Sequence, residues 1–492
     1  MAVTTHAETE RKYDAAADAE LPAWADIEGV AEVRGPRTEH LAAVYFDTAD
    51  QRLARYGATL RRRTGGGDAG WHLKVPAGPD SRTELRLPLD ERPEDATNAP
   101  PDELADLTSA MTRGAAIRPV AQLKTTRRVW ELFGDGGTPL AEVTDDRVTA
   151  SLLTEESTVE QWRELEVELA SPATAGVLAA AEKVLRKAGI RRAGHSSKLA
   201  RVLSPPVVAV PDADGSAGEA VLAYVRAQFD ALVTQDLLAR RDAPDAVHQL
   251  RVASRRLRAA LRVYERLLPR TGRLQNDLRW LGRQLADARD LEVQQEHLAS
   301  AVAALPVELA VGPVSARLTR HFSPAIAAAR ETVTSTLADR RYHRLLDDID
   351  RLLTDPDLPA RASRPANKEL PAHLRKAYRT IRRRLAHDTL HRGRKAAKRY
   401  RYALEVAEPS VGKVAAKARR RAKDLTKVLG EHQDGVVAQP LLRDLGMQAH
   451  LAGENGFTYG LLLEQERGRC ALVEDVFPAY WRRLAKTRLW NA

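Results

Sequence analysis

The sequence has a single cysteine, few aromatic residues and no long hydrophobic run. Cys470 alone excludes an internal disulfide framework and any zinc site built from cysteine ligands. The longest apolar stretch, near residues 299–311, contains Pro306 and Glu308 and is too short to cross a bilayer. The segment Met1–Lys12 carries charged residues before any apolar run, so no signal peptide is visible. We therefore expect a soluble cytoplasmic protein with no membrane partner.

The charged residues divide the chain into two unlike parts. Its 492 residues include 77 Lys and Arg and 67 Asp and Glu, a formal net charge of +10. Up to Ser204, where a Pro-rich stretch begins, 27 basic and 33 acidic residues give −6, and the remaining 50 basic and 34 acidic residues give +16. A single hydrophobic core rarely grows past ~250–300 residues. Length and charge together predict two domains, of which the second faces a polyanion.

The first part alternates with the period of a β-strand. Between Glu8 and Gly189, short segments in which side-chain character alternates are separated by clusters of Gly and Pro. Many short strands at this spacing predict an antiparallel barrel or sandwich. The expected strands include residues 43–46, 59–63, 71–75, 83–89, 128–133, 140–143 and 162–169.

Many of the alternating residues are charged. On a single strand such residues normally form the solvent face, but here charged sets recur on several strands. In a closed barrel one face points inward, and an interior with both signs of charge is costly unless it binds a ligand. Carboxylates suit Mg²⁺ or Mn²⁺, and Arg and Lys suit phosphate, so the pattern indicates a metal–polyphosphate site. The sets are Glu8, Glu10 and Lys12; Arg61 and Arg63; His72 and Lys74; Arg82, Glu84 and Arg86; and Glu164, Glu166 and Glu168.

The first part also resembles a known family. The run Glu8–Lys12 is similar to the ExExK signature of CYTH domains, the triphosphate tunnel metalloenzymes. ExExK by itself is a weak signal in a Glu-rich chain, but further similar segments follow in family order. The resemblance implies an eight-stranded antiparallel tunnel that binds a linear triphosphate. The later segments are residues 45–48, 60–63, 71–74, 82–86, 124–128, 141–147, 162–169 and 196–198.

The same resemblance implies roles for individual residues. Glu8, Glu10 and Lys12 are the expected catalytic residues, and Mg²⁺ or Mn²⁺ is the expected cofactor. The metal and the basic side chains would neutralise charge on the bridging oxygen during in-line attack by water. Which basic residue of 124–128 faces inward depends on the register, because a slip of one residue reverses the faces. The expected metal ligands are Glu8, Glu10, Glu166 and Glu168, with Glu84, Glu142 and Glu164 nearby; the expected phosphate ligands are Lys12, Arg61, Arg63, Lys74, Arg86, Lys124, Arg127, Arg147 and Lys198.

The second part has helical periodicity and follows a Pro-rich linker expected at residues 205–218. Along residues 250–268, apolar side chains recur in steps of three and four, which marks the buried stripe of a helix. Beside it, rotated by about 100°, runs a continuous basic stripe. Its members are His248, Arg251, Arg255, Arg258 and Arg262, with Arg256 adjacent.

This arrangement returns 143 residues later, which indicates an internal duplication. A second segment repeats as well, since residues 285–290 are similar to residues 429–434. Two segments repeated in order predict two similar helical bundles, at about residues 219–340 and 366–486. The second stripe consists of His391, Arg394, Lys398, Arg399 and Arg401.

The basic stripe has two interpretations. A run of charge on a helix is normally a solvated face with ion pairs. This stripe lacks interspersed carboxylates, so its charges repel one another unless an anion binds. The histidine at its head has no tight cluster of Cys, His or Asp that would favour a metal, and its recurrence favours phosphate contact or a bond between helices. We therefore favour anion binding.

The second part resembles the CHAD family, helical modules that bind inorganic polyphosphate. Residues 247–258 are similar to the first family motif and residues 390–402 to the second, within a region of about 219–486. The resemblance implies two pseudo-symmetric four-helix bundles with a basic surface between them. Two departures stand out. Gly393 is expected to loosen the first turn of its helix, and Lys398 replaces the arginine of the first repeat with a point charge.

These expectations combine into an α+β two-domain protein, with an antiparallel tunnel at residues 4–204 and an all-α domain after the linker. The leading hypothesis is an inorganic polyphosphate-binding protein whose tunnel hydrolyses triphosphate or polyphosphate ends with Mg²⁺ or Mn²⁺. A binding or scaffolding protein without catalysis and a nucleotidyl cyclase remain open. Nucleic acid is less favoured, because no aromatics that could stack on bases interrupt the stripe. Association with polyphosphate granules in the cytoplasm is a further expectation.

Overall fold

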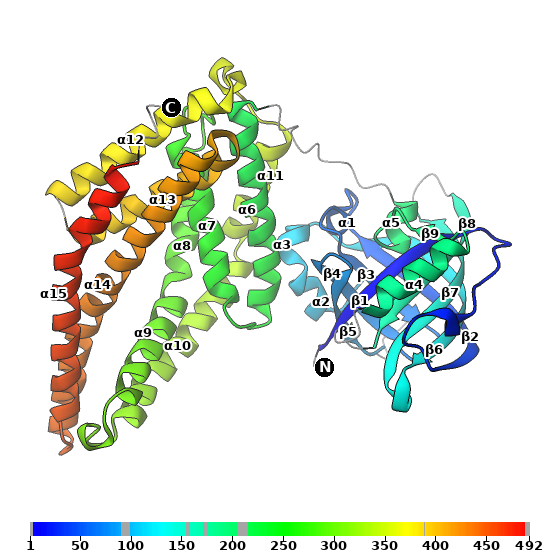
Figure 1. Cartoon of the computed structure of the whole chain (residues 1–492), viewed down its shortest axis with the longest axis horizontal. Helices are drawn as coiled ribbons and strands as arrows, with labels where there is room; N and C mark the ends of the chain where they lie inside the picture. The colour runs from blue at the N-terminus through cyan, green and yellow to red at the C-terminus, as the bar shows by residue number, and fades with distance from the viewer. Residues whose placement is uncertain are drawn as a thin grey trace. The chain divides into compact units, whose positions relative to one another are not determined.

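The structure, a computed structural model, describes residues 3–89, 99–153, 158–170, 176–203, 215–387 and 389–487. The chain forms two compact units, Met1–Val208 and Ala209–Ala492, and each is described by itself. Figure 1 shows the strands of the first unit and the helices of the second. Most of the predicted linker, residues 205–218, falls outside the described residues.

The first unit is a closed antiparallel barrel of eight strands. The sheet order is β5-β4-β3-β2-β6-β7-β8-β1, and pairing of β1 with β5 closes the ring. A short strand, β9 (Arg191–Arg192), adds to β1 outside the ring. The barrel strands are β1 (Thr4–Ala15), β2 (Glu32–Asp47), β3 (Thr59–Thr64), β4 (Gly70–Gly78), β5 (Ser81–Leu87), β6 (Arg118–Phe133), β7 (Pro139–Leu152) and β8 (Val159–Leu169).

The barrel confirms the predicted tunnel, but β2, β6 and β7 extend beyond the predicted strands. The added parts of β6 and β7 contribute buried apolar residues, among them Leu123 and Val148, to one core with Tyr45 of β2. Inward-facing charged residues such as Arg127 and Asp146 interrupt the apolar alternation there, so the pattern of the sequence ends these strands too early.

Helix α4 (Gly176–Lys187) covers part of the outer face of the barrel, which explains why the charged residues of β8 point inward. Leu165 and Val167 of β8 are fully buried, and they belong to one core with Leu178 and Leu185 of α4. The alternate residues of β8 therefore face the interior. The remaining helices of this unit are short: α1 (Arg52–Arg55), α2 (Asp102–Leu107), α3 (Ser109–Thr112) and α5 (Lys198–Val202).

The second unit is helical in the part that the structure describes. None of the described helices has the length and hydrophobicity that a membrane crossing requires. The helices are α6 (Ala217–Arg240), α7 (Ala246–Val263), α8 (Gly272–Gln284), α9 (Ala286–Ala303), α10 (Val314–Ala338), α11 (Arg340–Thr354), α12 (Ala366–His387), α13 (Leu390–Val411), α14 (Lys413–Leu451) and α15 (Phe457–Ala485).

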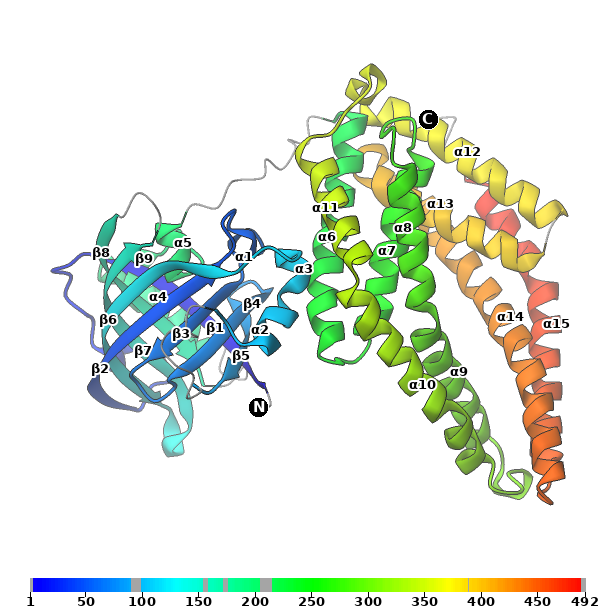
Figure 2. The same ribbon diagram turned by 180° about the vertical axis from the view of Figure 1, so that it is seen from behind.

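The order of these helices agrees with the internal duplication. Helices α6 and α7 correspond to α12 and α13, and the two helices α8 and α9 correspond to the single long helix α14. Helix α10 begins 143 residues before α15, the offset of the basic stripes. Figure 2 shows the two antiparallel pairs, α9 with α10 and α14 with α15, and buried side chains of all four helices share one hydrophobic core. Helices α7 and α13 pack against each other, so the two repeats meet at the helices that carry the basic stripes.

Gly393 has a packing role near the start of α13. The residue is buried, and a Cβ atom built there would lie 2.2 Å from Cδ2 of Leu385 in α12. The absence of a side chain thus lets α12 approach α13 closely. The glycine thus lies at a contact between two helices, where any side chain would have to displace the half-buried side chain of Leu385.

Candidate phosphate and metal sites

The interior of the barrel forms a charged cavity of about 690 Å³. Most of the predicted tunnel residues line it. Two other predicted residues form ion pairs with residues that line the cavity. Glu84 lies 3.5 Å from Lys74, and Glu164 lies 2.7 Å from Lys198. The predicted residues that line the cavity are Glu8, Glu10, Lys12, Arg61, Arg63, Lys74, Arg86, Arg127, Glu142, Glu166, Glu168 and Lys198.

One wall of the cavity carries a row of carboxylates. Glu10, Glu168, Glu142 and Glu131 lie directly opposite one another on the neighbouring strands β1, β8, β7 and β6. Like charges in this arrangement repel. Lys12 lies 3.0 Å from Glu10, and Arg37 lies about 3 Å from Glu131 and Glu142, but Glu168 has no ion pair or hydrogen bond among the described residues.

Burial and the neighbouring carboxylate of Glu8 raise the pKa of Glu168 to about 7, and Glu10 and Glu166 add to the effect. This wall therefore has an excess of negative charge that a cation would relieve.

A second group of carboxylates lies deeper in the tunnel. Asp146, Glu164 and Glu166 each place one oxygen within 4.8 Å of the others, a spacing at which a metal ion can be held. Lys198 lies between them, with its Nζ atom 2.9, 2.7 and 2.8 Å from the three carboxylates. Arg127 adds a contact of 2.7 Å to Asp146. The charge of this group is therefore largely compensated by the protein.

Asp146 is a tunnel residue that the interpretation of the sequence missed. It is fully buried, and it accepts two hydrogen bonds from Arg127, which lies directly opposite on β6. Its neighbour Asp145 faces outward and binds Arg163. Only the strand register distinguishes the two aspartates, because both lie in the same segment of the sequence.

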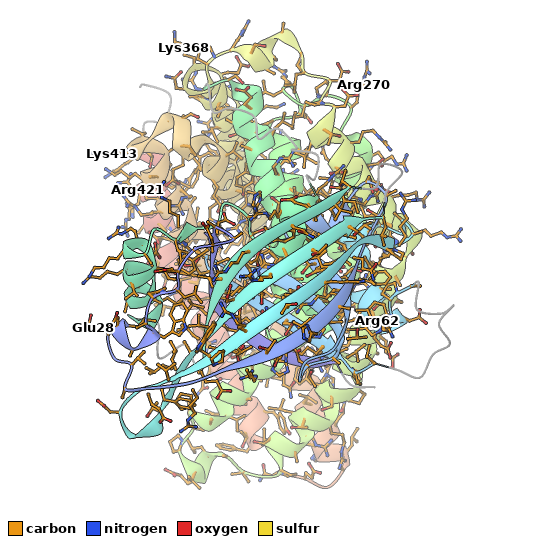
Figure 3. All side chains as sticks on the ribbon, turned by 90° about the vertical axis from the view of Figure 1, so that its right-hand side faces the viewer. Glu28, Arg62, Arg270, Lys368, Lys413 and Arg421 are labelled. Atoms are coloured by element: carbon orange, nitrogen blue, oxygen red, sulfur yellow. The ribbon has the colours of Figure 1, made fainter. Side chains whose placement is uncertain are left out.

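The opposite wall is basic. Burial lowers the pKa of Arg63 to about 9, and its neighbours Arg61 and Arg127 contribute to the shift. Arg63 contacts the carboxylate of Asp68, while Arg61 lies 3.8 Å from Glu84 and 3.4 Å from the hydroxyl of Tyr45. Arg62 belongs to the opposite face of the strand, and Figure 3 shows it at the outer edge of the barrel. Three arginines, Arg61, Arg63 and Arg127, thus gather on this side, and each contacts at least one carboxylate.

The structure corrects two expectations about phosphate ligands. Lys124 and Arg147 are exposed and lie on the outer face of the barrel, where they border a groove with Thr126. The register pairs Thr126 with Arg147 on this outer face and Arg127 with Asp146 on the inner face. Because alternate residues of a strand point to opposite faces, Arg127 lies inside the tunnel and Lys124 does not.

The predicted basic residues of the helical unit lie on α7 and α13. At the centre, Arg251 donates hydrogen bonds of 2.9 Å to the Ala286 carbonyl oxygen and 3.0 Å to Asp290. The corresponding Arg394 lies beside Gly430 and interacts electrostatically with Asp434. Ala286 and Asp290 correspond to Gly430 and Asp434 in the repeated segments 285–290 and 429–434, so equivalent residues lie near the two central arginines.

Between these arginines lie Arg255 and Lys398. Burial lowers the pKa of Lys398 to about 7, and Arg394, Arg255 and Arg401 strengthen the effect. The Nε atoms of Arg255, Arg394 and Arg401 are buried, and none has a hydrogen-bond partner in the described part of the chain. Buried donors without partners are costly, and an anion would satisfy them.

The two histidines precede this cluster. His391 contacts the side-chain oxygen of Gln433, and burial lowers the pKa values of both His391 and His248. Neighbouring basic residues, among them Arg289 near His248 and Lys395 near His391, disfavour the charged imidazole further. Neither histidine belongs to the one potential metal-binding group found among the described residues. Because no further metal ligands gather beside them in the described part of the chain, these histidines fit hydrogen bonding better than metal binding.

Two known families match the two units. The CYTH domain family matches residues 6–203, and the CHAD domain family matches residues 223–443. Uncharacterized proteins from two strains of Mycobacterium tuberculosis are each 36% identical over 511 residues, covering 98% of this chain and 97% of theirs. The chain is a CYTH–CHAD protein. The CYTH–CHAD order agrees with the resemblance that the sequence motifs carry.

Solved structures similar to the CYTH–CHAD chain have lower identity. PptA from Streptomyces chartreusis is 20% identical, with 54% of this chain and 99% of that chain covered and a TM-score of 0.45. The CHAD domain from the plant Ricinus communis is 26% identical, with 56% and 94% covered and a TM-score of 0.45. A putative adenylyl cyclase from Hippeastrum, described as having a dominant triphosphatase activity, is 16% identical, with 39% and 93% covered and a TM-score of 0.22.

Membership of these families gives the function in outline. CYTH members include triphosphatases and cyclases, and CYTH tunnel enzymes depend on metal. CHAD and CYTH domains are associated with the binding of polyphosphate or triphosphate. The CYTH–CHAD protein therefore has a function related to polyphosphate or triphosphate.

Proposed function

We propose that the CYTH unit hydrolyses triphosphate, or the end of a polyphosphate chain, with Mg²⁺ or Mn²⁺, and that the CHAD unit binds inorganic polyphosphate. The observation that carries the proposal is the gathering of like charges on two sides of one cavity. Glu168 stands in a row of carboxylates without a partner among the described residues, and on the other side Arg61 and Arg127 lie close enough to Arg63 to lower its pKa, although each of the three also contacts a carboxylate. A phosphate chain with its metal ion offers both signs of charge, so it relieves both walls together.

The donor set of the carboxylate row fits a hard divalent cation. Its glutamates offer only oxygen ligands, which Mg²⁺ and Mn²⁺ prefer. Glu8, Glu10 and Glu168, with Glu142, would hold the ion. When bound, the ion supplies a Lewis acid that polarises a phosphoryl oxygen. The deeper group of Asp146, Glu164 and Glu166 is the less favoured metal site, because Lys198 already compensates its charge.

The reaction is the hydrolysis of a phosphoanhydride bond. Water attacks the terminal phosphorus, the bond to the bridging oxygen breaks, and orthophosphate and a chain shorter by one phosphate are released. Arg61, Arg63 and Arg127 would hold the phosphoryl oxygens and stabilise the negative charge that develops on the bridging oxygen. The guanidinium fork suits this task because it binds two oxygens at once.

Release of phosphate from tripolyphosphate in the presence of Mn²⁺ tests the enzymatic proposal. Glu10→Ala should lower the rate at least about 100-fold, since it removes a metal ligand and a member of the carboxylate row. Glu32→Ala is a matched control, because Glu32 is a glutamate on the exposed part of β2 and, among the described residues, forms an ion pair with Arg34 alone. The control should retain the rate of the unaltered protein.

Two results would contradict the proposal. No release by the unaltered protein with either metal would leave the tunnel as a phosphate-holding module without catalysis. Equal rates for the Glu10→Ala variant and the unaltered protein would place the chemistry elsewhere.

A further inference from the structure

The two repeats of the CHAD unit differ at one point of their basic surface. In the offset that relates α7 to α13, Arg256 corresponds to Arg399, and Arg262 corresponds to Glu405. The contact between Arg256 and Glu405 on one side therefore has, as its counterpart on the other side, a contact between Arg399 and Arg262. The same geometry places an ion pair on one side and two like charges on the other.

The side with Glu405 is closed by contacts within the protein. Arg256 Nε lies 3.0 Å from the Glu405 carboxylate, and the Tyr224 hydroxyl donates a hydrogen bond of 2.7 Å to that carboxylate. The guanidinium groups of Arg256 and Arg401 lie 5.7 and 4.7 Å from the centre of the Tyr402 ring. Glu405 therefore places a carboxylate beside Arg256, and the Tyr402 ring lies against Arg256 and Arg401, so an anion is less favoured on this side than on a side without a carboxylate.

The other side lacks these contacts. Ala259 stands where the second repeat has Tyr402, so no ring covers the arginines there. Helix α8 packs against α7 (Figure 2), and two of its arginines, Arg279 and Arg283, lie close enough to Arg258 to lower the pKa of Arg258. We name this group the open-side cluster; its members are Arg258, Arg262, Arg279, Arg283 and Arg399.

The open-side cluster has almost no anionic partner. Within the described ranges, none of its members forms a hydrogen bond or ion pair except Arg262, which lies 3.5 Å from Glu265. Burial, followed by these like-charged neighbours, lowers the pKa values of Arg258 and Arg399. Arg279 and Arg283 are exposed and four residues apart on one helix, so they can follow an extended anion away from the centre.

We propose that a polyphosphate chain held at the centre of α7 and α13 leaves it on one side only, over the open-side cluster, with Arg279 and Arg283 as phosphate-binding residues. The inference rests on the proposed polyphosphate binding and adds the path of the chain and two residues. A flexible polyanion with a charge on every unit matches a line of guanidinium groups without requiring base contacts.

The internal repeat supplies a matched control. Offset by 144, as in the repeated segments 285–290 and 429–434, Arg279 and Arg283 correspond to Lys423 and Lys427 of α14, which are also exposed and four residues apart. The affinity of the full-length protein for long-chain polyphosphate would be measured at two salt concentrations for Arg279→Ser/Arg283→Ser and for Lys423→Ser/Lys427→Ser. The first pair should weaken binding about threefold to tenfold and flatten the salt dependence, and the second should change affinity less than about twofold.

The possible results distinguish a failure of the one-sided path from a failure of polyphosphate binding by the CHAD unit. Equal weakening by the two pairs would contradict a one-sided path, and no effect of the arginine pair would contradict a role for Arg279 and Arg283. Failure of the unaltered protein to bind long-chain polyphosphate would instead overturn the proposed function of the CHAD unit, and the inference with it. Because all four residues are exposed, circular dichroism should be the same for both variants and the unaltered protein.

Discussion

At the scale of single residues, Lys398 connects polyphosphate binding to pH. It faces Arg394 and Arg401 on its own helix, Arg255 on α7 and Asp434 on α14, and burial among these groups lowers its pKa from 10.5 to about 7. A bound phosphate chain would raise that pKa toward its ordinary value. In the protein without polyphosphate, Lys398 is largely neutral above pH 7. Binding of polyphosphate between about pH 7 and 10 should therefore be accompanied by uptake of a proton at Lys398.

Affinity for polyphosphate should accordingly rise as pH falls from 10 to 7 and become constant just below 7. Titration calorimetry at pH 8.5 in buffers with different ionisation enthalpies would measure the uptake, which we expect to approach one proton. Lys398→Arg should bind without this uptake, because arginine keeps its charge throughout this range. An unchanged proton uptake in that variant would show that another group titrates.

At the scale of elements, the contact of α12 with α13 depends on Gly393. A methyl group there would meet Leu385 Cδ2 at 2.2 Å and Cγ at 3.0 Å. We expect Gly393→Ala to lower the free energy of unfolding of the CHAD unit by about 1–2 kcal/mol, since overpacking outweighs the better helix propensity of alanine. Urea unfolding followed by circular dichroism would measure the change.

Gly460→Ala in α15 provides the comparison for this prediction. Gly460 also lies within a helix, but a methyl group there would meet no atom of another element within 4 Å, so alanine should stabilise the unit by about 0.5–1 kcal/mol. The two glycines should therefore give changes of opposite sign. Stabilisation by both substitutions would mean that the Leu385 side chain turns aside without cost.

At the scale of the whole molecule, the two units should lose their activities separately. Arg63→Ala should lower tripolyphosphate hydrolysis at least tenfold and leave the affinity for long polyphosphate within about twofold. Arg255→Ala/Lys398→Ala should do the reverse, because both groups lie at the centre of the CHAD unit. Measuring both activities on each full-length variant tests the prediction, and loss of both activities in either variant would contradict it.

The sequence by itself determined that this protein has two domains of different fold class. The change in net charge near residue 204, the charged alternation on several strands and the recurrence of the basic stripe after 143 residues are local or periodic signals. They predicted a tunnel followed by a duplicated helical domain, and the fold confirms both. Each signal depends only on residues close in sequence or on a regular repeat, which is why it could be read without coordinates.

The tertiary structure decided which members of each pattern face one another. The pairing of β6 with β7 places Arg127 and Asp146 inside the tunnel and Lys124 and Arg147 outside, although all four lie in family-like segments. In the helices, the packing of α7 against α13 gives Arg256 a carboxylate partner and leaves the equivalent Arg399 beside Arg262. Strand register and helix packing depend on contacts between residues that are distant in sequence. A periodic pattern shows which residues share a face of a strand or helix, but those contacts decide which residues that face meets.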